Sequence, residues 1–121
     1  MAKFYENDIH ERIYKFVIRV INFSKVLPST QQNSIIIYQL VKSGTSMGAN
    51  DKEADGAESK RDFIAKYSIV KKENKETNYW LRVIEDTNPK DIIQQMGDLR
   101  NEGSEILRIV SAIIIKTKNR P

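Results

Sequence analysis

The sequence contains no cysteine among its 121 residues. Disulfide scaffolds and thiolate metal sites are therefore excluded, and this composition is typical of a reducing compartment, so we expect a cytoplasmic protein. No apolar run approaches the roughly 18 residues that a membrane-spanning helix needs. The first residues, MAKFYENDIHER, are charged where a signal peptide is apolar. We therefore expect no membrane association and no export.

Glycine and proline are also scarce, with five and three copies. Pro28, Pro89 and the pair Asp55-Gly56 are the main interruptions of a pattern in which apolar residues recur at steps of three and four. Asp8 and Glu11 resemble a capping box before the first helix. The pattern predicts one all-α domain over residues 1–121, an antiparallel up-down four-helix bundle. Its helices are predicted at about 8–27, 31–54, 57–85 and 89–117.

Histidine occurs once, as His10. Di-metal sites in helical bundles use pairs of Glu-x-x-His, and no glutamate stands three residues before this histidine. A carboxylate metal site on Glu53, Glu73 and Glu76 is therefore the less favoured interpretation. We expect Glu73 and Glu76 to pair with bases such as Lys42 or to support a polar contact with Asn50, and we expect His10 to be exposed in the first turn.

Signatures of catalysis are missing from the sequence. There is no glycine-rich phosphate loop, no nucleophile spaced with a base, and no metal-ligand spacing. The sequence therefore predicts no catalytic residue, no cofactor, no bound metal and no small-molecule substrate. We expect a protein that is not an enzyme.

The stretch SGTSMGAND places Gly44 and Gly48 four residues apart within a predicted helix. Each interior glycine costs a helix roughly 0.5–1 kcal/mol relative to alanine. We therefore expect close helix packing there, with the gap filled by an aromatic ring from the third helix, Phe63 or Tyr67, or by a closely approaching backbone. Gly103 is predicted to do the same in the fourth helix. A hinge or a ligand gap is the alternative.

Basic residues are in mild excess, with 20 Lys and Arg against 16 Asp and Glu, a formal charge of +4 and a pI of about 9.3. Such an excess permits nucleic-acid contact without requiring it. In the first helix, cations follow one another on the outer face, and an up-down fold would bring further cations to the same end. The alternative is an ordinary solvated surface, since acids are intermixed. The predicted nucleic-acid-binding residues are Arg12, Lys15, Arg19, Lys60, Arg61, Lys116, Lys118 and Arg120.

In the first and fourth predicted helices, apolar residues cover more of the helix surface than the single stripe that a bundle core needs. A second buried face indicates self-association, and a thicker core is the alternative. We expect a homo-oligomer. The predicted interface residues are Val17, Ile18, Ile21, Ile109 and Ile115, and Ile114 also lies beyond the stripe.

The middle of the chain carries a set of small, charged and aromatic residues in a distinctive order. By this set the chain resembles the bacterial four-helix-bundle proteins encoded by intervening sequences in 23S ribosomal RNA genes. Asp51, Lys52, Lys71 and Asn74 depart from the family pattern. The matching residues are Ser46, Gly48, Ala49, Asn50, Glu53, Ala54, Ser59, Lys60, Asp62, Phe63, Ile64, Lys72, Glu73, Glu76, Thr77, Tyr79, Trp80 and Leu81.

The resemblance implies a ring-like homo-oligomer, a pentamer, with no known catalytic residues. Related bundles accompany reverse transcriptases in diversity-generating retroelements, where a basic oligomer contacts polymerase and RNA. The first hypothesis is therefore a scaffold or accessory protein for RNA or for a nucleic-acid enzyme. A pure protein-interaction bundle and a carboxylate metal-binding bundle are the alternatives. Steep salt dependence of binding would separate the first two, because counterion release scales with phosphate contacts.

Overall fold

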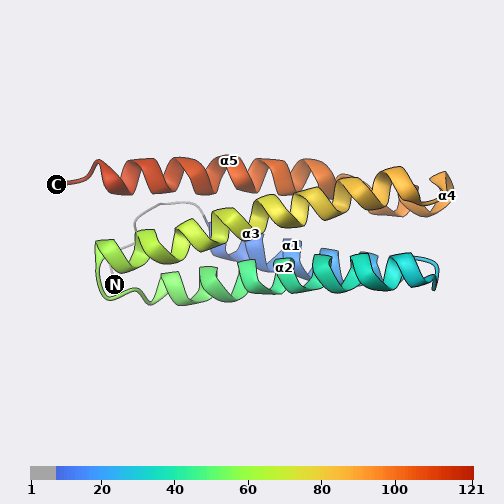
Figure 1. Cartoon of the computed structure of the whole chain (residues 1–121). Helices are drawn as coiled ribbons and strands as arrows, with labels where there is room; N and C mark the ends of the chain where they lie inside the picture. Colours follow the sequence, from blue (N-terminus) through green and yellow to red (C-terminus); the bar gives the residue numbers. More distant parts are fainter. Residues whose placement is uncertain (1–7) are drawn as a thin grey trace.

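The computed structural model describes residues 8–121 and is all-α, with no strand among these residues. Four long helices lie side by side (Figure 1), and a short helix with a following 3-10 turn lies between the third and the last of them. Within the described part of the chain, no helix is both long enough and apolar enough to span a membrane. The elements are α1 (Ile9–Ser24), α2 (Gln31–Asp55), α3 (Lys60–Thr87), α4 (Lys90–Ile93), the turn Gln94–Met96 and α5 (Leu99–Lys118).

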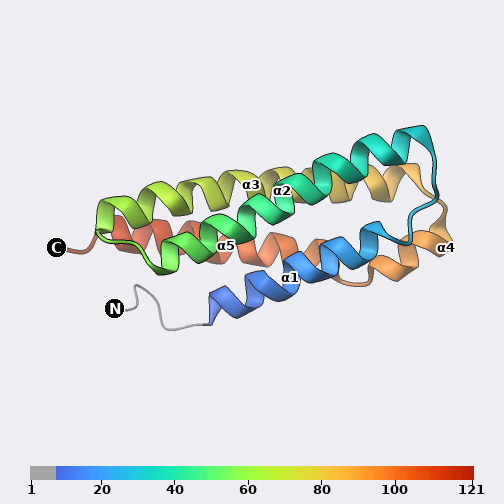
Figure 2. The ribbon, with the colours of Figure 1, turned by 90° about the horizontal axis from the view of Figure 1, so that it is seen from below.

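The long helices form two sides of a helical bundle. Helix α1 packs against α2 and α5, and α3 packs against the same two helices. Seen from below, α1 and α2 lie in front of α3 and α5 (Figure 2). We call these two sides the α1–α2 face and the α3–α5 face.

Side-chain caps determine where three of the helices begin. The Asp8 carboxylate accepts from the Glu11 backbone N–H at 3.1 Å, so a cap is confirmed at the predicted residue. Thr30 caps α2 in the same way. Ser59 accepts from the Asp62 N–H at 3.0 Å, so α3 begins at Lys60, three residues after its predicted start.

The first helix is shorter than predicted. It ends at Ser24, whose hydroxyl donates to the Ile21 carbonyl at 2.6 Å, whereas the prediction extended it to residue 27. Leu27 nevertheless lies in the core, reached from the following turn. Apolar spacing therefore continued past the end of the helix, and periodicity alone could not locate that end.

The prediction of one continuous helix over residues 89–117 is wrong. Gly97 has φ +58° and ψ −131°, a conformation that residues with a side chain rarely adopt, and it separates α4 and its turn from α5. Met96 and Leu99 are both buried on either side of this break. The apolar spacing therefore continues across Gly97, and this continuity concealed the break.

The core is built from the predicted apolar stripes together with a few buried polar residues. Asn74 and Thr77 interrupt the apolar stripe of α3, as predicted, and both are fully buried. The Thr77 hydroxyl lies 2.8 Å from the Ser43 hydroxyl of α2, and Thr77 also donates to its own helix. Ile114 belongs to the core as well, so its placement outside the stripe was wrong.

The glycines do permit close helix packing, but the predicted partner of α2 was wrong. A methyl group added at Gly48 would lie 3.0 Å from Cγ2 of Val17, and one added at Gly44 would lie 3.4 Å from Cγ1 of Val20. The glycines of α2 therefore admit valines of α1, not aromatic rings of α3. Of those rings, Tyr67 donates to Asp51 instead. Residues 56–59 connect α2 to α3 outside both helices, and they shift which residues of the two helices lie level with one another.

Gly103 of α5 packs most closely of all. A methyl group there would overlap Oδ1 of Asn78 and would lie 3.0 Å from the Phe16 ring. The Asn78 amide also donates to the Gly103 carbonyl at 3.1 Å. The close packing predicted at Gly103 is thus confirmed.

Candidate functional site

His10 lies in a polar network that joins three helices. Its Nδ1 is 2.8 Å from Oδ1 of Asp51, and its Nε2 is 3.0 Å from Oδ1 of Asp55. The Tyr67 hydroxyl donates to the same Asp51 oxygen at 2.6 Å. The prediction of an exposed His10 is therefore wrong. Asp51 and Asp55 stand one helical turn apart on α2, and this spacing lets both reach one imidazole ring.

The network ties helices together at a buried carboxylate. Asp51 is 3 % exposed, and each of its observed partners offers a polar hydrogen or a ring nitrogen. Burial raises the pKa of the Tyr67 hydroxyl above its usual value, and the neighbouring Asp51 charge raises it further. Tyr67 therefore stays protonated and donates. The sequence signal for this site was Asp51 itself, which departs from the family pattern.

The glutamates considered as metal ligands have other contacts. Glu73 accepts from the Ser46 hydroxyl at 2.9 Å, and Glu76 accepts from the Trp80 indole N–H at 3.3 Å. Lys42 is placed over the Tyr38 ring, with its Nζ 5.9 Å from the ring centre. Among residues 8–121, no three His, Asp or Glu side chains are arranged to hold a metal ion.

The α1–α2 face carries hollows and exposed apolar side chains. A groove of about 530 Å³ lies between the two helices, with Tyr14, Val17 and Gly48 among its lining residues. A second hollow of about 430 Å³ is lined by α2 residues that include Tyr38. Tyr14, Ile18 and Tyr38 are between 40 % and 63 % exposed. This face therefore offers apolar surface to a partner.

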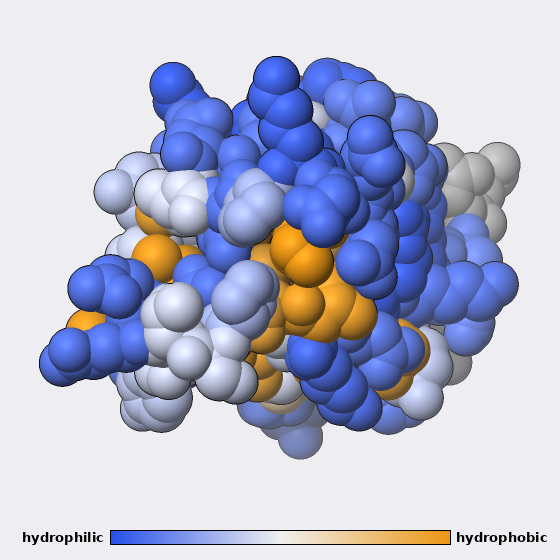
Figure 3. All heavy atoms as spheres, turned by 90° about the vertical axis from the view of Figure 1, so that its right-hand side faces the viewer, coloured by the Kyte–Doolittle hydropathy of each residue, from blue (hydrophilic) through white to orange (hydrophobic). Residues whose placement is uncertain are grey.

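Further apolar surface is present at one end of the bundle. Figure 3 shows hydrophobic atoms among hydrophilic ones on the end that faces right in Figure 1, where α4 lies. Ile92 and Ile93 of α4 are only partly buried, and Val26, which follows α1, is exposed.

The predicted interface residues do not form one continuous patch. Ile18 and Ile115 are exposed, whereas Val17, Ile21 and Ile109 are partly buried. Arg12, in the first turn of α1, contacts Glu102 and Glu105 of α5. Ile115 comes about three helical turns after these glutamates in α5. It therefore lies beyond the level at which α1 begins, and α1 has no residue beside it. Ile18 and Ile115 therefore mark separate surfaces.

Two of the three predicted cations of α1 are held by carboxylates. Arg12 bonds Glu102 at 2.7 Å and approaches Glu105 at 3.3 Å, and Arg19 bonds Asp98 at 2.5 Å. The Arg12 guanidinium lowers the pKa of Glu102, and Arg19 lowers that of Asp98. These pairs fasten α1 to α5 and to the residue before it. Lys15, the third cation, is exposed.

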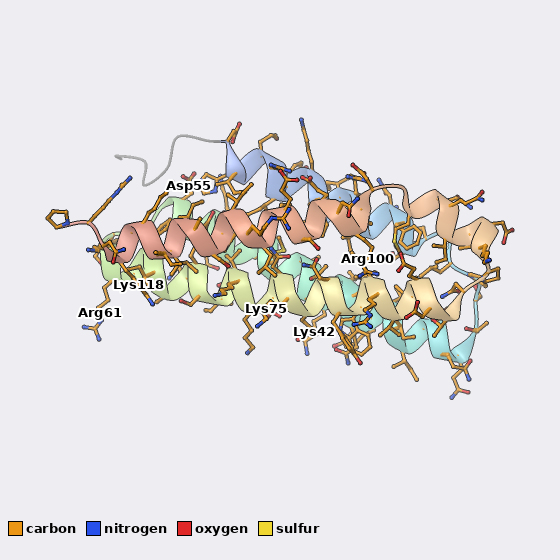
Figure 4. All side chains as sticks on the ribbon, turned by 90° about the horizontal axis from the view of Figure 1, so that it is seen from above. Lys42, Asp55, Arg61, Lys75, Arg100 and Lys118 are labelled. Atoms are coloured by element: carbon orange, nitrogen blue, oxygen red, sulfur yellow. The ribbon has the colours of Figure 1, made fainter. Side chains whose placement is uncertain are left out.

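The predicted cations at the end of α5 do lie near the start of α3. Lys60 donates to the carbonyl oxygens of Lys118 and Arg120. Arg61 and Lys118 lie at the same end of the bundle (Figure 4). Lys116 and Arg120 are exposed in the same segment. Arg12 and Arg19, which contact the first half of α5 and Asp98, do not join this group.

Sequence reasoning missed a set of exposed cations in the middle of the α3–α5 face. None of them takes part in the ion pairs observed within residues 8–121. The sequence did carry a signal for these cations, because several of them recur at helical spacing on the side of α3 opposite its buried stripe. These cations are Lys71, Lys72, Lys75, Arg82 and Arg108. We use the name cationic stripe for these five residues together with Arg61 and Lys118.

Comparison with known proteins identifies the family and the fold of the chain. Residues 5–112 match the family model described as 23S rRNA-intervening sequence protein. A search of curated proteins finds no match. A crystal structure of a protein of unknown function from the S23 ribosomal protein family of Bacteroides thetaiotaomicron VPI-5482 is similar, with 34 % sequence identity and a TM-score of 0.76. The alignment covers 88 % of this chain and 97 % of that one.

The family match spans α1, α2, α3, α4 and most of α5, and the solved relative has the same fold over nearly its whole length. The chain belongs to the family of 23S rRNA-intervening sequence proteins.

Proposed function

We propose that the chain is a non-enzymatic, homo-oligomeric scaffold in the cytoplasm, whose subunit is an up-down antiparallel four-helix bundle. The observation that carries this proposal is the exposed apolar surface of the α1–α2 face. Tyr14, Ile18, Ile35 and Tyr38 are all large, apolar and exposed on this helix pair, and Tyr14 and Tyr38 line its two hollows. Monomers rarely leave apolar patches of more than a few hundred Å² in water.

A ring, such as the pentamer that the family resemblance implies, requires a heterologous interface in which two different surfaces of each subunit meet. Ile18 on α1 and Ile115 on α5 lie on separate surfaces, as such an interface demands. The observed separation therefore supports a ring better than a single shared patch would.

Light scattering tests the scaffold proposal. We expect the wild-type mass to be several times the 14.0 kDa of one chain. Ile18→Glu and Ile115→Glu should each lower it while helical circular dichroism persists, because a charge is costly to bury in an interface. Ser104→Glu places the same charge on an exposed residue of α5 and should leave the mass unchanged. A wild-type mass of one chain at micromolar concentration would contradict the proposal.

RNA contact is the second candidate function, and the cationic stripe favours it over a pure protein-interaction role. Its side chains are exposed, and the acids Glu102 and Glu105 of α5 are directed toward Arg12 of α1. Positive charge is thereby separated from negative charge. A pull-down from the native cell with and without nuclease distinguishes the two roles, since only an RNA-dependent set of partners should be lost. Metal analysis of the purified protein tests the carboxylate alternative.

A further inference from the structure

We infer that Tyr79 is a stacking platform for a base of single-stranded RNA, whose phosphates follow the cationic stripe of α3 and α5. The inference rests on the proposed RNA contact and adds the form of the ligand and the residue that receives it. Proteins that bind single strands combine cations that follow the backbone with aromatic rings on which bases stack. Tyr79 supplies such a ring within the stripe.

The Tyr79 ring is exposed and supported. It is 57 % exposed, and its centre lies 4.9 Å from that of Trp80 in an edge-on arrangement of 74°. Trp80 is partly buried against the core, and its indole donates to Glu76. Because Trp80 is held in this way, the contact restricts the motion of the Tyr79 ring. A restricted ring loses less conformational entropy when a base stacks on it.

Three cations lie near Tyr79 on the outer surface of α3. Lys72 and Lys75 precede it by seven and four residues, and Arg82 follows it by three, so all four share one face of the helix. Arg61 continues the face toward the start of α3, which extends the stripe over about 30 Å at the helical rise. A backbone laid along α3 would therefore meet Arg61 near the start of the helix and several cations between Lys71 and Arg82.

Helix α5 contributes to the same surface. The bond from Asn78 to Gly103 and the bonds from Lys60 to the end of α5 align the two helices. By this alignment Arg108 lies at about the level of Lys72. Figure 4 views the molecule from the α3–α5 side, with Arg61 and Lys118 at one end and Lys75 in the middle of α3. The stripe thus spans both helices.

The acids of this region are directed elsewhere or lie at its end. Glu73 bonds Ser46 of α2, and Asp62 bonds Lys66. Glu85 pairs with Arg100 near the end of α3, where Asp86 is exposed. Glu76, one helical turn before Tyr79, accepts from the Trp80 indole. Every carboxylate of α3 between Arg61 and Arg82 is therefore engaged by another side chain.

Other exposed tyrosines have different surroundings. Tyr14 lines the groove of the α1–α2 face together with Asp8 and Glu11, which would repel phosphates. The ring of Tyr38 is covered on one side by the ammonium group of Lys42. Tyr79 is therefore the tyrosine best placed to receive a base. A duplex keeps the faces of its bases stacked against one another and exposes only their edges and the backbone, so a stacking platform selects single strands.

The test measures binding of a fluorescein-labelled single-stranded RNA of about 16 nucleotides, the upper end of the range for one binding module. Tyr79→Ala should weaken binding by about 5- to 100-fold, the range expected for loss of one stacked base. Tyr79→Phe keeps the ring and should bind within about twofold of wild type. Gln32→Ala changes an exposed residue of α2 that lies outside every surface described above and should bind like wild type. Circular dichroism verifies that each variant is folded.

Charge is tested separately. Replacement of Lys72, Lys75 and Arg82 by Gln should flatten the salt dependence of log K by about 2, at roughly 0.7 for each lost contact. Arg12→Gln with Arg19→Gln removes cations already paired with carboxylates and should change the slope little. Trp80, the only tryptophan, should change its fluorescence when RNA is added, because it touches Tyr79.

The outcomes separate the inference from the scaffold proposal. If Tyr79→Ala binds as well as wild type, or if a duplex of equal length competes as well as the single strand, the stacking platform is overturned. An oligomer that binds no single-stranded RNA overturns the inference and leaves the scaffold intact. A monomer that binds RNA with the expected variant pattern overturns the scaffold proposal and leaves the inference intact. Single-stranded DNA of the same sequence shows whether the 2′-hydroxyl contributes.

Discussion

The two faces of the bundle share one core but differ at their seams and on their outer surfaces. On the α1–α2 face, valines of α1 lie against glycines of α2, and the exposed side chains include Tyr14, Ile18, Ile35 and Tyr38. On the α3–α5 face, Asn78 bonds the Gly103 backbone, and the exposed side chains include the cationic stripe. Core periodicity therefore places no constraint on what the outer surface offers. The apolar surface of the α1–α2 face suits protein contact, and the cationic stripe of the α3–α5 face suits a polyanion.

The largest expected effect comes from filling the two glycine seams. Gly103→Leu should lower the free energy of unfolding by about 3 kcal/mol, because its side chain would overlap Asn78 and Phe16. Gly48→Leu should cost about 1 kcal/mol, since it meets only Val17 and gains helix propensity. Urea denaturation measures both. Equal costs would mean that the seams do not differ, and a stabilised Gly48→Leu would rule out close packing there.

The next effect concerns the buried carboxylate of the α1–α2 side. Asp51→Asn should lower the free energy of unfolding by about 2 kcal/mol, because His10 and Tyr67 lose a charged hydrogen-bond partner. Tyr67→Phe removes a single hydroxyl and should cost about 1 kcal/mol. Thermal unfolding followed by circular dichroism provides the comparison. An Asp51→Asn variant as stable as wild type would show that the network is not a structural tie.

A smaller effect should appear in acid, through the pair that fastens α1 to α5. The Arg12 guanidinium lowers the pKa of Glu102 in the folded state. This pair therefore stabilises the fold above the ordinary glutamate pKa, and the contribution is lost as pH falls through the lowered value. Because both side chains are partly exposed, we expect a loss of about 1 kcal/mol between about pH 5 and pH 3.

The control for the acid experiment is Glu102→Gln, which cannot titrate. Its free energy of unfolding should be lower than that of wild type at neutral pH and should fall less steeply in acid. If both proteins lose stability in parallel down to about pH 3, other carboxylates dominate the acid response.

The smallest effect concerns repulsion within the cationic stripe. Lys75 has Lys71, Lys72 and Arg82 among its neighbours on α3. Lys75→Glu should therefore raise the free energy of unfolding by a few tenths of a kcal/mol at low salt, and Lys75→Gln by about half as much. About 1 M salt should remove the difference, since it screens exposed charges. A destabilised Lys75→Glu at low salt would mean that the stripe is not mutually repulsive.

Much of the fold could be predicted because helical periodicity is local. The apolar stripe of α1 from Ile9 to Phe23, the cap at Asp8 and the close packing at Gly103 all follow from spacing or residue type. The break at Gly97 was missed for the same reason, because Met96 and Leu99 keep the helical spacing across it. Periodicity reports which side chains face the core, and it does so whether or not the helix is continuous.

The candidate sites were harder to predict, because a partner on another helix determines the state of a side chain. His10 reads as a polar first-turn residue until Asp51 and Asp55 are placed beside it. Arg12 reads as a free cation until Glu102 lies against it. These partners are far away in the sequence, and their positions depend on loop lengths and on the rotation of each helix about its axis.

By itself, the sequence determined the all-α class, most of the residues that form the core, and the family, because apolar spacing and residue identity along one chain suffice for these. Only the tertiary structure decided which charges are paired across helices and which remain on the surface. It joined Arg12 and Arg19 to carboxylates and left the cationic stripe of the α3–α5 face exposed. The physical reason is that an ion pair depends on a distance in space, which helical spacing within one segment does not specify.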